Sequence, residues 1–103
     1  MIVRVWRGRA TAAHAEAYQT HVTARVLPKL VRIAGFLGGR VLRREVGDDV
    51  EFMVMTEWGS RDAIRAFAGP SPEIAVVEAE AKALLRQFDE RVEHFELAYE
   101  SRI

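Results

Sequence analysis

The chain has no cysteine, and this absence removes several classes of function at once. Disulfide scaffolds, cysteine nucleophiles and thiolate metal centres all need that residue. A chain without cysteine also fits a reducing compartment, so we expect a cytoplasmic protein.

The chain also lacks an excess of charge and a long apolar run. Lys plus Arg is 15 and Asp plus Glu is 15, which gives a net charge of zero. A nucleic-acid-binding surface needs a basic excess on one face, and a membrane-spanning helix needs about 18 consecutive apolar residues. Charges interrupt the apolar residues of the N-terminal stretch MIVRVWRGR, which is unlike a signal peptide. We therefore expect neither nucleic acid nor a membrane among the partners.

What the chain does have is alternation of side-chain character in four places. A length of 103 residues suits one domain with a single core. Alternating residues typical of half-buried strands predict four strands, at 2–9, 36–47, 51–58 and 90–100.

Helices are predicted between these strands. Thr11 is a suitable N-cap for a helix over 12–34, with a kink or a new turn at Pro28. A second helix is predicted over 61–68, and the composition of 73–88 favours another helix, in one piece or two. The resulting βαββαβ order predicts a ferredoxin-like α+β fold, in which the helices cover one face of an antiparallel sheet.

The strand at 51–58 is apolar on both of its faces. Strand residues alternate between the faces, so Met53 and Met55 lie opposite the even-numbered residues, which include aromatic ones. Helices of a two-layer fold cover only one face, and a large apolar patch on the other face needs a partner. We expect a second copy, sheet facing sheet, in a twofold dimer that also covers Val5 or Trp6. The space between sheet and helices can then hold a small ligand.

Four segments of the chain resemble the antibiotic biosynthesis monooxygenase domain. They are RVWRGRA, VLPKLVRIAGFLGGRVLRR, VEFMVMTEWGSRDAIRAFAG and LLRQFDERVEHFELAY. The resemblance covers nearly the whole chain, 1–103, as one domain, and it implies a dimeric α/β barrel. The superfamily that it implies includes quinol and polyketide oxygenases, haem-degrading enzymes and isomerases of signal molecules.

The resemblance to the aromatic-polyketide members implies a monooxygenase that uses no metal, flavin or other cofactor. The deprotonated phenolic substrate itself reduces oxygen. The protein then supplies an apolar pocket, a group that promotes deprotonation and donors that hold the oxyanion.

The chain departs from this family at positions that matter. It contains no Asn, although some sites of the family use one. The haem-degrading branch implies an Asn on the first strand, a Trp in the helix after the TEWGS hinge, and a His about ten residues further on. Aligned on TEWGS, those positions hold Arg7, Phe67 and Val77. The sequence is therefore unlike a haem degrader.

Two histidines and a tyrosine are the candidate catalytic residues. Tyr18 and His21 share one face of the first predicted helix with His14. If that face looks into the cavity, His21 is a base and Tyr18 a donor; otherwise Tyr18 is a boundary residue and His14 lies at an exposed helix start. His94, between acidic neighbours on the last strand, is either a base with a shifted pKa or a satisfied core or interface histidine. His14 and His21 are about 10 Å apart along the helix, too far to share a metal, and we expect none.

Aromatic residues and one arginine are the candidate substrate-binding residues. Arg4 and Arg7 lie on opposite faces of the first strand, and the one on the open face needs either a carboxylate or an anionic ligand. Aromatic side chains can line a pocket for a flat ligand, although core or interface packing explains them as well. The expected substrate-binding set is Trp6, Arg7, Phe52, Trp58 and Phe67.

The leading hypothesis is a cofactor-independent monooxygenase that acts on a small aromatic, phenolic or quinol-type substrate. The alternative is a dimeric binding protein of the same fold, which holds a small hydrophobic ligand or haem without turning it over.

Overall fold

One antiparallel sheet forms the frame of the protein, and the computed structural model describes all residues, 1–103. The strand order is β2-β3-β1-β4, and the short strand β5 also pairs directly with β1. The strands are β1 (Ile2–Thr11), β2 (Phe36–Val46), β3 (Asp49–Trp58), β4 (Leu85–Phe88) and β5 (Glu93–Glu96). This order confirms the predicted ferredoxin-like α+β fold.

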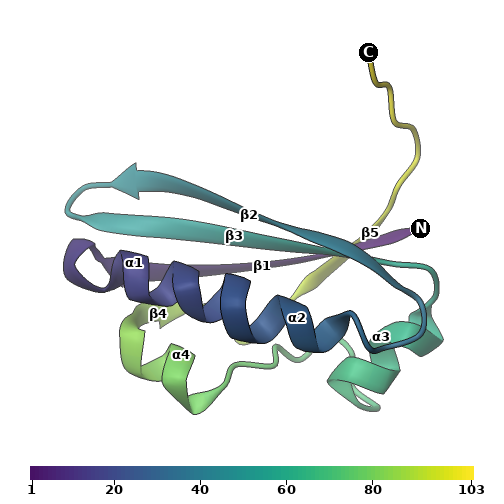
Figure 1. Ribbon diagram of the computed structural model, residues 1–103, viewed down its shortest axis with the longest axis horizontal. Helices are drawn as coiled ribbons and strands as arrows, with labels where there is room; N and C mark the ends of the chain where they lie inside the picture. The colour runs from purple at the N-terminus through teal and green to yellow at the C-terminus, as the bar shows by residue number, and fades with distance from the viewer.

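The helices lie together on one side of that sheet (Figure 1). They are α1 (Ala12–His21), a π-helical turn η1 (Val22–Val26), α2 (Leu27–Leu30), α3 (Arg61–Ala68) and α4 (Ala79–Leu84). The first three follow one another without a break. None of the helices is long and apolar enough to cross a membrane.

The first helical region is shorter than predicted and passes through Pro28 without ending there. Pro28 occupies one of the first two positions of α2, directly after the π-helical turn. A proline is tolerated at a helix start because its missing N–H has no partner there in any case. The chain leaves the helix after Leu30, and Gly35 takes a positive φ of 92° before β2.

The tandem glycines of β2 bring the sheet close to α2. The register between β2 and β3 shifts between Phe36 and Gly38, which marks a bulge or a similar irregularity. A Cβ atom on Gly39 would lie 3.0 Å from Leu27 Cδ2. The absence of a side chain at Gly39 therefore lets the helix pack closely on the sheet.

The C-terminal third corrects the sequence prediction. Within 73–88, which the sequence predicted to be helical, only α4 is a helix. The last four residues of that range form β4, which pairs with β1, for example Phe88 with Gly8. The predicted strand over 90–100 is a strand only at β5. The ladder along β1 decides this outcome, because cross-strand pairing outweighs the helix propensity of a short segment.

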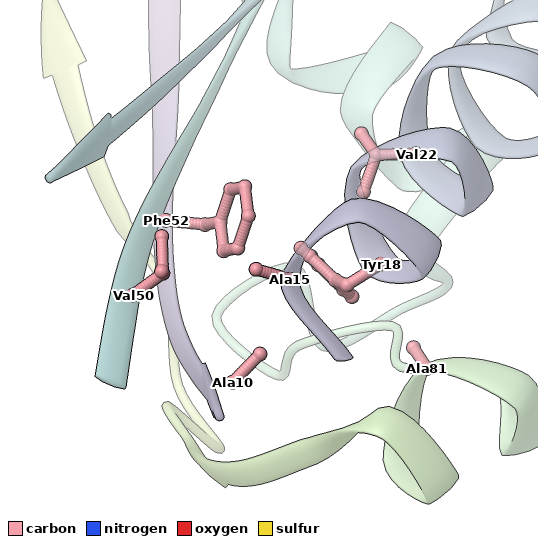
Figure 2. Packing of buried hydrophobic residues seen from close by; sticks show 7 residues of the cluster. All are labelled: Ala10, Ala15, Tyr18, Val22, Val50, Phe52 and Ala81. Atoms are coloured by element: carbon pink, nitrogen blue, oxygen red, sulfur yellow. The ribbon is translucent and has the colours of Figure 1, made fainter. Parts of the chain in front are cut away.

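Two clusters of buried residues join the helices to the covered face of the sheet. In the first, Phe52 points from β3 toward α1, and Ala81 of α4 closes the cluster from the other side (Figure 2). In the second, Trp58 packs with Leu30 and Ile64. Both aromatic side chains are completely buried, so this face carries the core.

The opposite face of the sheet has no helix over it (Figure 1). Alternation places Val5, Met53 and Met55 there, while Trp6 lies on the helix side. Of the two residues proposed for this face, the structure therefore selects Val5. Leu42 is 46% exposed and Phe95 is 51% exposed. We call this surface, with Val5, Leu42, Met53, Met55 and Phe95, the open face.

Candidate functional site

A small apolar cavity lies between the sheet and the helices. Its volume is about 80 Å³, and most of its walls are hydrophobic. The sheet supplies Trp6, Val54 and Thr56, and the first helical region supplies Tyr18 and His21. The remaining lining residues are Arg4, Val22, Val26, Leu27, Leu30, Phe67, Val76, Val77, Glu78, Ala81 and Val92.

Helix α1 places both Tyr18 and His21 in the cavity. Every third residue of α1 from Ala15 onward is buried, so Ala15, Tyr18 and His21 form one inward stripe. The ring of Tyr18 packs against Phe52, with 4.9 Å between the centroids. Burial raises the pKa of Tyr18, so its hydroxyl stays protonated and can donate a hydrogen bond.

His21 is a buried side chain with an unbonded ring nitrogen. It is only 2% exposed, and its Nδ1 atom has no hydrogen bond in the protein. The Oε2 atom of Glu80 lies 3.2 Å from Nδ1, and Arg25 also pairs with that oxygen at 2.9 Å. The carboxylate can accept a hydrogen bond from Nδ1 when that nitrogen carries a proton. The pair can therefore stabilise His21 after it has accepted a proton.

Trp6 forms a fixed wall of the cavity. Its indole N–H donates a hydrogen bond to the backbone oxygen of Asp89, at 2.9 Å. Its ring contacts those of Tyr18 and Phe88. Because its only donor is already used, Trp6 can contribute contact area to a ligand but no hydrogen bond.

The three other aromatic candidates divide into one wall residue and two supporting residues. Phe67 lines the cavity and stacks on Trp58, with 5.7 Å between the centroids. Trp58 donates to the Thr56 hydroxyl at 2.9 Å and is completely buried, as is Phe52. Phe52 and Trp58 therefore lie behind the cavity wall and are not among the residues that line it.

Arg4 lines the cavity, although the sequence analysis did not include it among the site residues. It is 4% exposed and has no carboxylate partner. Its guanidinium donates to the backbone oxygens of Pro72 and Ile74, and it lies over the Phe67 ring at 5.6 Å. Burial lowers its pKa to about 10, so it remains charged at neutral pH.

His94 lies behind Arg4 and does not line the cavity. Its Nε2 atom is 3.0 Å from Arg4 Nη1. An arginine only donates, so Nε2 is the acceptor and the imidazole is neutral in this arrangement. Burial and the charges of Arg4 and Arg61 lower the pKa of His94, against a smaller opposing effect of Glu73. His94 can therefore position Arg4, and it has no direct path to a ligand.

The family profile described as "Antibiotic biosynthesis monooxygenase" matches residues 1–70, about two thirds of the chain. The chain belongs to this family.

Solved structures of this monooxygenase family share the fold at low sequence identity. A variant of SnoaB, a cofactor-independent oxygenase from Streptomyces nogalater, is 20% identical, with a TM-score of 0.67 over 96% of this chain and 94% of that one. The haem degrader MhuD of Mycobacterium tuberculosis, with two haems in its active site, is 19% identical, with a TM-score of 0.64 over 99% and 100%. No sequence among the curated proteins is significantly similar to the chain.

Within this member of the antibiotic biosynthesis monooxygenase family, Arg7 is placed differently from the expectation. It lies on the open face, away from the cavity, and its Nη1 atom is 2.9 Å from Glu93 Oε1. Both side chains are partly exposed. The cross-strand ion pair that the sequence offered as the alternative is therefore present, and the placement of Arg7 among the cavity residues is corrected.

The remaining histidine lies apart from the site. His14 is exposed in the first turn of α1 and does not line the cavity. No group of three or more His, Asp or Glu side chains is arranged to hold a metal ion. The polar side chains of the candidate site are therefore Arg4, Tyr18, His21, Thr56 and Glu78, among mostly hydrophobic walls.

Proposed function

We propose that this family member is a cofactor-independent monooxygenase whose substrate, a small phenol or quinol, binds in the cavity described above. The observation that carries the proposal is His21: a buried imidazole with an unbonded nitrogen, beside a carboxylate, on the wall of an apolar cavity. A buried imidazole with an unused nitrogen on the wall of a pocket, oriented by a neighbouring carboxylate, is a candidate for a general base.

The small cavity limits the substrate to one ring, and even one ring requires the wall to move. An engineered apolar cavity of about 150 Å³ is large enough for benzene, and this one has about 80 Å³. Residues 75–78 form the irregular part of the wall, outside any helix or strand. Because irregular segments open at the lowest cost, we expect this segment to shift when a ring enters.

His21 has the role of base in this proposal. It takes the proton of a phenolic hydroxyl, and Glu80, 3.2 Å from Nδ1, stabilises the imidazolium that forms. Tyr18 keeps its proton because burial raises its pKa, and it donates a hydrogen bond to the developing phenolate oxygen. Trp6 and Phe67 hold the ring by contact.

The oxidation needs no reductant besides the substrate. The ring carbon beside the oxyanion transfers electrons to O₂ and forms a C–O bond, which gives a hydroperoxide. That carbon then loses its proton while the O–O bond breaks, so a ring carbonyl forms and the second oxygen atom leaves as water. A quinol and O₂ thus yield a hydroxyquinone and water, and the four electrons that O₂ accepts all come from the quinol.

The test is oxygen uptake with a panel of one-ring quinols and an anthrone, followed with an oxygen electrode. We expect at least one quinol to be consumed with an equal amount of O₂. Loss of a general base lowers rates by about 10²–10⁴-fold, so His21→Ala should lose at least about 100-fold in kcat/KM. His14→Ala, on the exposed side of the same helix, is the matched control and should keep the wild-type rate.

Two outcomes contradict this proposal. One is a panel on which the wild-type protein consumes no oxygen above the uncatalysed rate. The other is a His21→Ala protein, correctly folded by circular dichroism, that retains the wild-type rate.

The alternative is a binding protein of the same fold that does not turn its ligand over. The similarity to the haem degrader MhuD makes haem the first ligand to test. The residues here do not fit haem: the cavity is about 80 Å³, and the one histidine on its wall has Glu80 beside Nδ1. A hemin titration followed by absorbance should therefore show no stoichiometric shift of the Soret band.

We also propose a homodimer in which two open faces meet. Leu42, Met53, Met55 and Phe95 form the accessible apolar part of this surface, and two strand-to-strand ion pairs, Arg7–Glu93 and Arg44–Glu51, accompany them. Apolar surface of this extent on one face of a sheet supports a twofold contact between identical surfaces.

A further inference from the structure

Arg4 keeps a buried positive charge without a negative partner. Its side chain is 4% exposed, and none of the ion pairs in the protein includes it. Buried charges in proteins are usually paired, because an unpaired one costs several kcal/mol of solvation. The two backbone oxygens and the histidine nitrogen around it offset that cost only in part, since all three acceptors are neutral.

The guanidinium also has donors left over. A guanidinium carries five N–H groups. Nη1 uses both of its hydrogens, on Pro72 and His94, and Nη2 uses one, on Ile74. The Nε–H and the second Nη2–H have no partner in the protein. The Nε–H shares one edge of the guanidinium with an N–H of Nη2, and that edge matches the two oxygens of a carboxylate.

No carboxylate on the cavity wall pairs with Arg4, so none competes with an anionic ligand for the guanidinium. The one acidic residue on the wall, Glu78, is exposed and lies 3.5 Å from Lys29. Thr56, the cross-strand neighbour of Arg4, already accepts from Trp58. Arg4 is thus the only arginine or lysine on a wall that is mostly hydrophobic.

We propose that the cavity contains an anion-binding subsite formed by Arg4, and that its ligand is a one-ring aromatic carboxylate. The ring lies between Trp6 and Phe67, and the carboxylate accepts hydrogen bonds from Nε–H and Nη2–H of Arg4. The choice of a hydroxyl as the second ring substituent rests on the function proposed above. With that function, the substrate class is hydroxyaryl carboxylates, with the hydroxyl toward Tyr18 and His21. Arg4 then sets specificity, and His94 positions it.

The alternative role of Arg4 is purely structural, as a clamp that ties the segment around Pro72 and Ile74 to the sheet. A clamp makes no distinction between a charged ligand and a neutral one of the same shape. An anion-binding subsite does, because a charge-assisted, two-point hydrogen bond in an apolar cavity is stronger than a neutral one. The two roles therefore differ in a measurement that needs no mutation.

The experiment is a titration of the wild-type protein with 4-hydroxybenzoate and with 4-hydroxybenzamide, its neutral counterpart of nearly equal shape, under nitrogen at pH 7.5. Binding is followed by isothermal titration calorimetry. We expect the carboxylate to bind at least tenfold more tightly than the amide. Equal affinities, tighter binding of the amide, or no binding of either up to millimolar concentration would overturn the proposal.

Two variants sharpen the result. Arg4→Gln should reduce the preference for the carboxylate to less than twofold, with circular dichroism and urea unfolding to verify the fold. Arg65→Gln, which removes one positive charge at an exposed position of α3, should leave the preference unchanged. If Arg4→Gln does not fold, Arg4→Lys keeps one charge without the paired edge and should lower the preference at least fivefold. A full preference in whichever folded Arg4 variant is measured overturns the proposal.

This test separates the subsite from the proposed reaction. Binding under nitrogen requires no turnover, so a carboxylate preference together with no oxygen uptake supports the subsite and contradicts the monooxygenase. Oxygen uptake with neutral quinols, without any preference for the carboxylate, supports the monooxygenase and overturns the subsite.

Discussion

Arg4 and Arg7 lie three residues apart on β1, and they illustrate how the two faces of one sheet differ. Arg7 is on the open face, partly exposed, with Glu93 of the neighbouring strand 2.9 Å away. Arg4 is under the helices, almost fully buried, and takes part in no ion pair. A surface ion pair of the first kind contributes at most about 1 kcal/mol and needs no function to explain it. A buried charge without a counter-ion is costly, so its presence beside a cavity points to a ligand.

The largest expected difference between the faces is in packing energy, and neighbouring residues of β3 test it. Phe52 is completely buried under α1, whereas Met53 is partly exposed on the open face. Phe52→Ala should lower the free energy of unfolding by about 3–5 kcal/mol, because it leaves a cavity in the core. Met53→Ala should cost less than about 2 kcal/mol. Urea denaturation checks both, and equal costs would contradict the assignment of the core to one face.

The proposed dimer predicts that a charge on the open face separates the subunits without unfolding them. Met55→Glu would place like charges near each other across the twofold axis, which costs several kcal/mol of association energy. Light scattering after size exclusion should show a dimer for wild type and a monomer for this variant. Ala66→Glu, which adds the same charge at an exposed position of α3, should remain dimeric. A monomeric wild-type protein would disprove the dimer outright.

The removal of Arg4 and the removal of Arg7 should lower the free energy of unfolding by different amounts. Arg4→Gln removes the guanidinium that donates to the backbone oxygens of Pro72 and Ile74, which costs about 1–3 kcal/mol. Arg7→Gln loses a partly exposed ion pair and should cost less than about 1 kcal/mol. Chemical denaturation of both variants at pH 7.5 provides the comparison. If Arg7→Gln costs more, the open-face pair has a role beyond that of a surface ion pair.

The smallest predicted effect is a pH dependence that arises from His94. Burial, Arg4 and Arg61 lower its pKa below the ordinary value of 6.5, and Glu73 opposes them. The unfolded chain therefore binds more protons than the folded chain as the pH falls below 6.5. The free energy of unfolding should decrease as the pH falls from 6.5 to the pKa of His94 in the folded state. Below that pKa, His94 should contribute no further change.

His94→Gln is the matching variant for that pH dependence. The side-chain amide oxygen can still accept from Arg4, but it does not titrate. Subtraction of its stability curve from that of the wild type, measured by denaturation between pH 4.5 and 7.5, isolates the contribution of His94. If the difference rises toward acid pH, the pKa of His94 is raised in the folded state and the assignment is wrong.

The order of the elements could be predicted from the sequence, because hydrophobic periodicity is a local signal. Alternation identified β1, β2 and β3. The start of α3 is also a local feature, because the hydroxyl of Ser60 caps it by accepting from the Ala63 N–H at 3.1 Å. The boundary of α4 could not be predicted in the same way. Leu85–Phe88 is a strand because β1 offers it a ladder, and that ladder depends on the tertiary structure.

Only the part of the candidate site that lies on a single helix could be predicted from the sequence. Tyr18 and His21 share a helical face, so their joint presence in the cavity follows from local geometry. Arg4 was missed because its acceptors, Pro72 and Ile74, lie about 70 residues away in sequence. A signal existed, since Arg4 alternates with the apolar Ile2 and Trp6 on one face of β1. That pattern indicates a buried charge but not its partners.

The most direct test of the central claim, that ligands bind under the helices and not on the open face, is a methyl-selective NMR titration with 4-hydroxybenzoate. The account predicts that the methyl signals of Val22, Leu27 and Val54, on the cavity wall, shift with a single saturation curve. It also predicts a downfield shift of the Arg4 Nε–H signal, while the methyl signals of Met53 and Met55 stay in place. Shifts confined to the methionines of the open face, with the cavity methyl groups and Arg4 unchanged, would contradict the account.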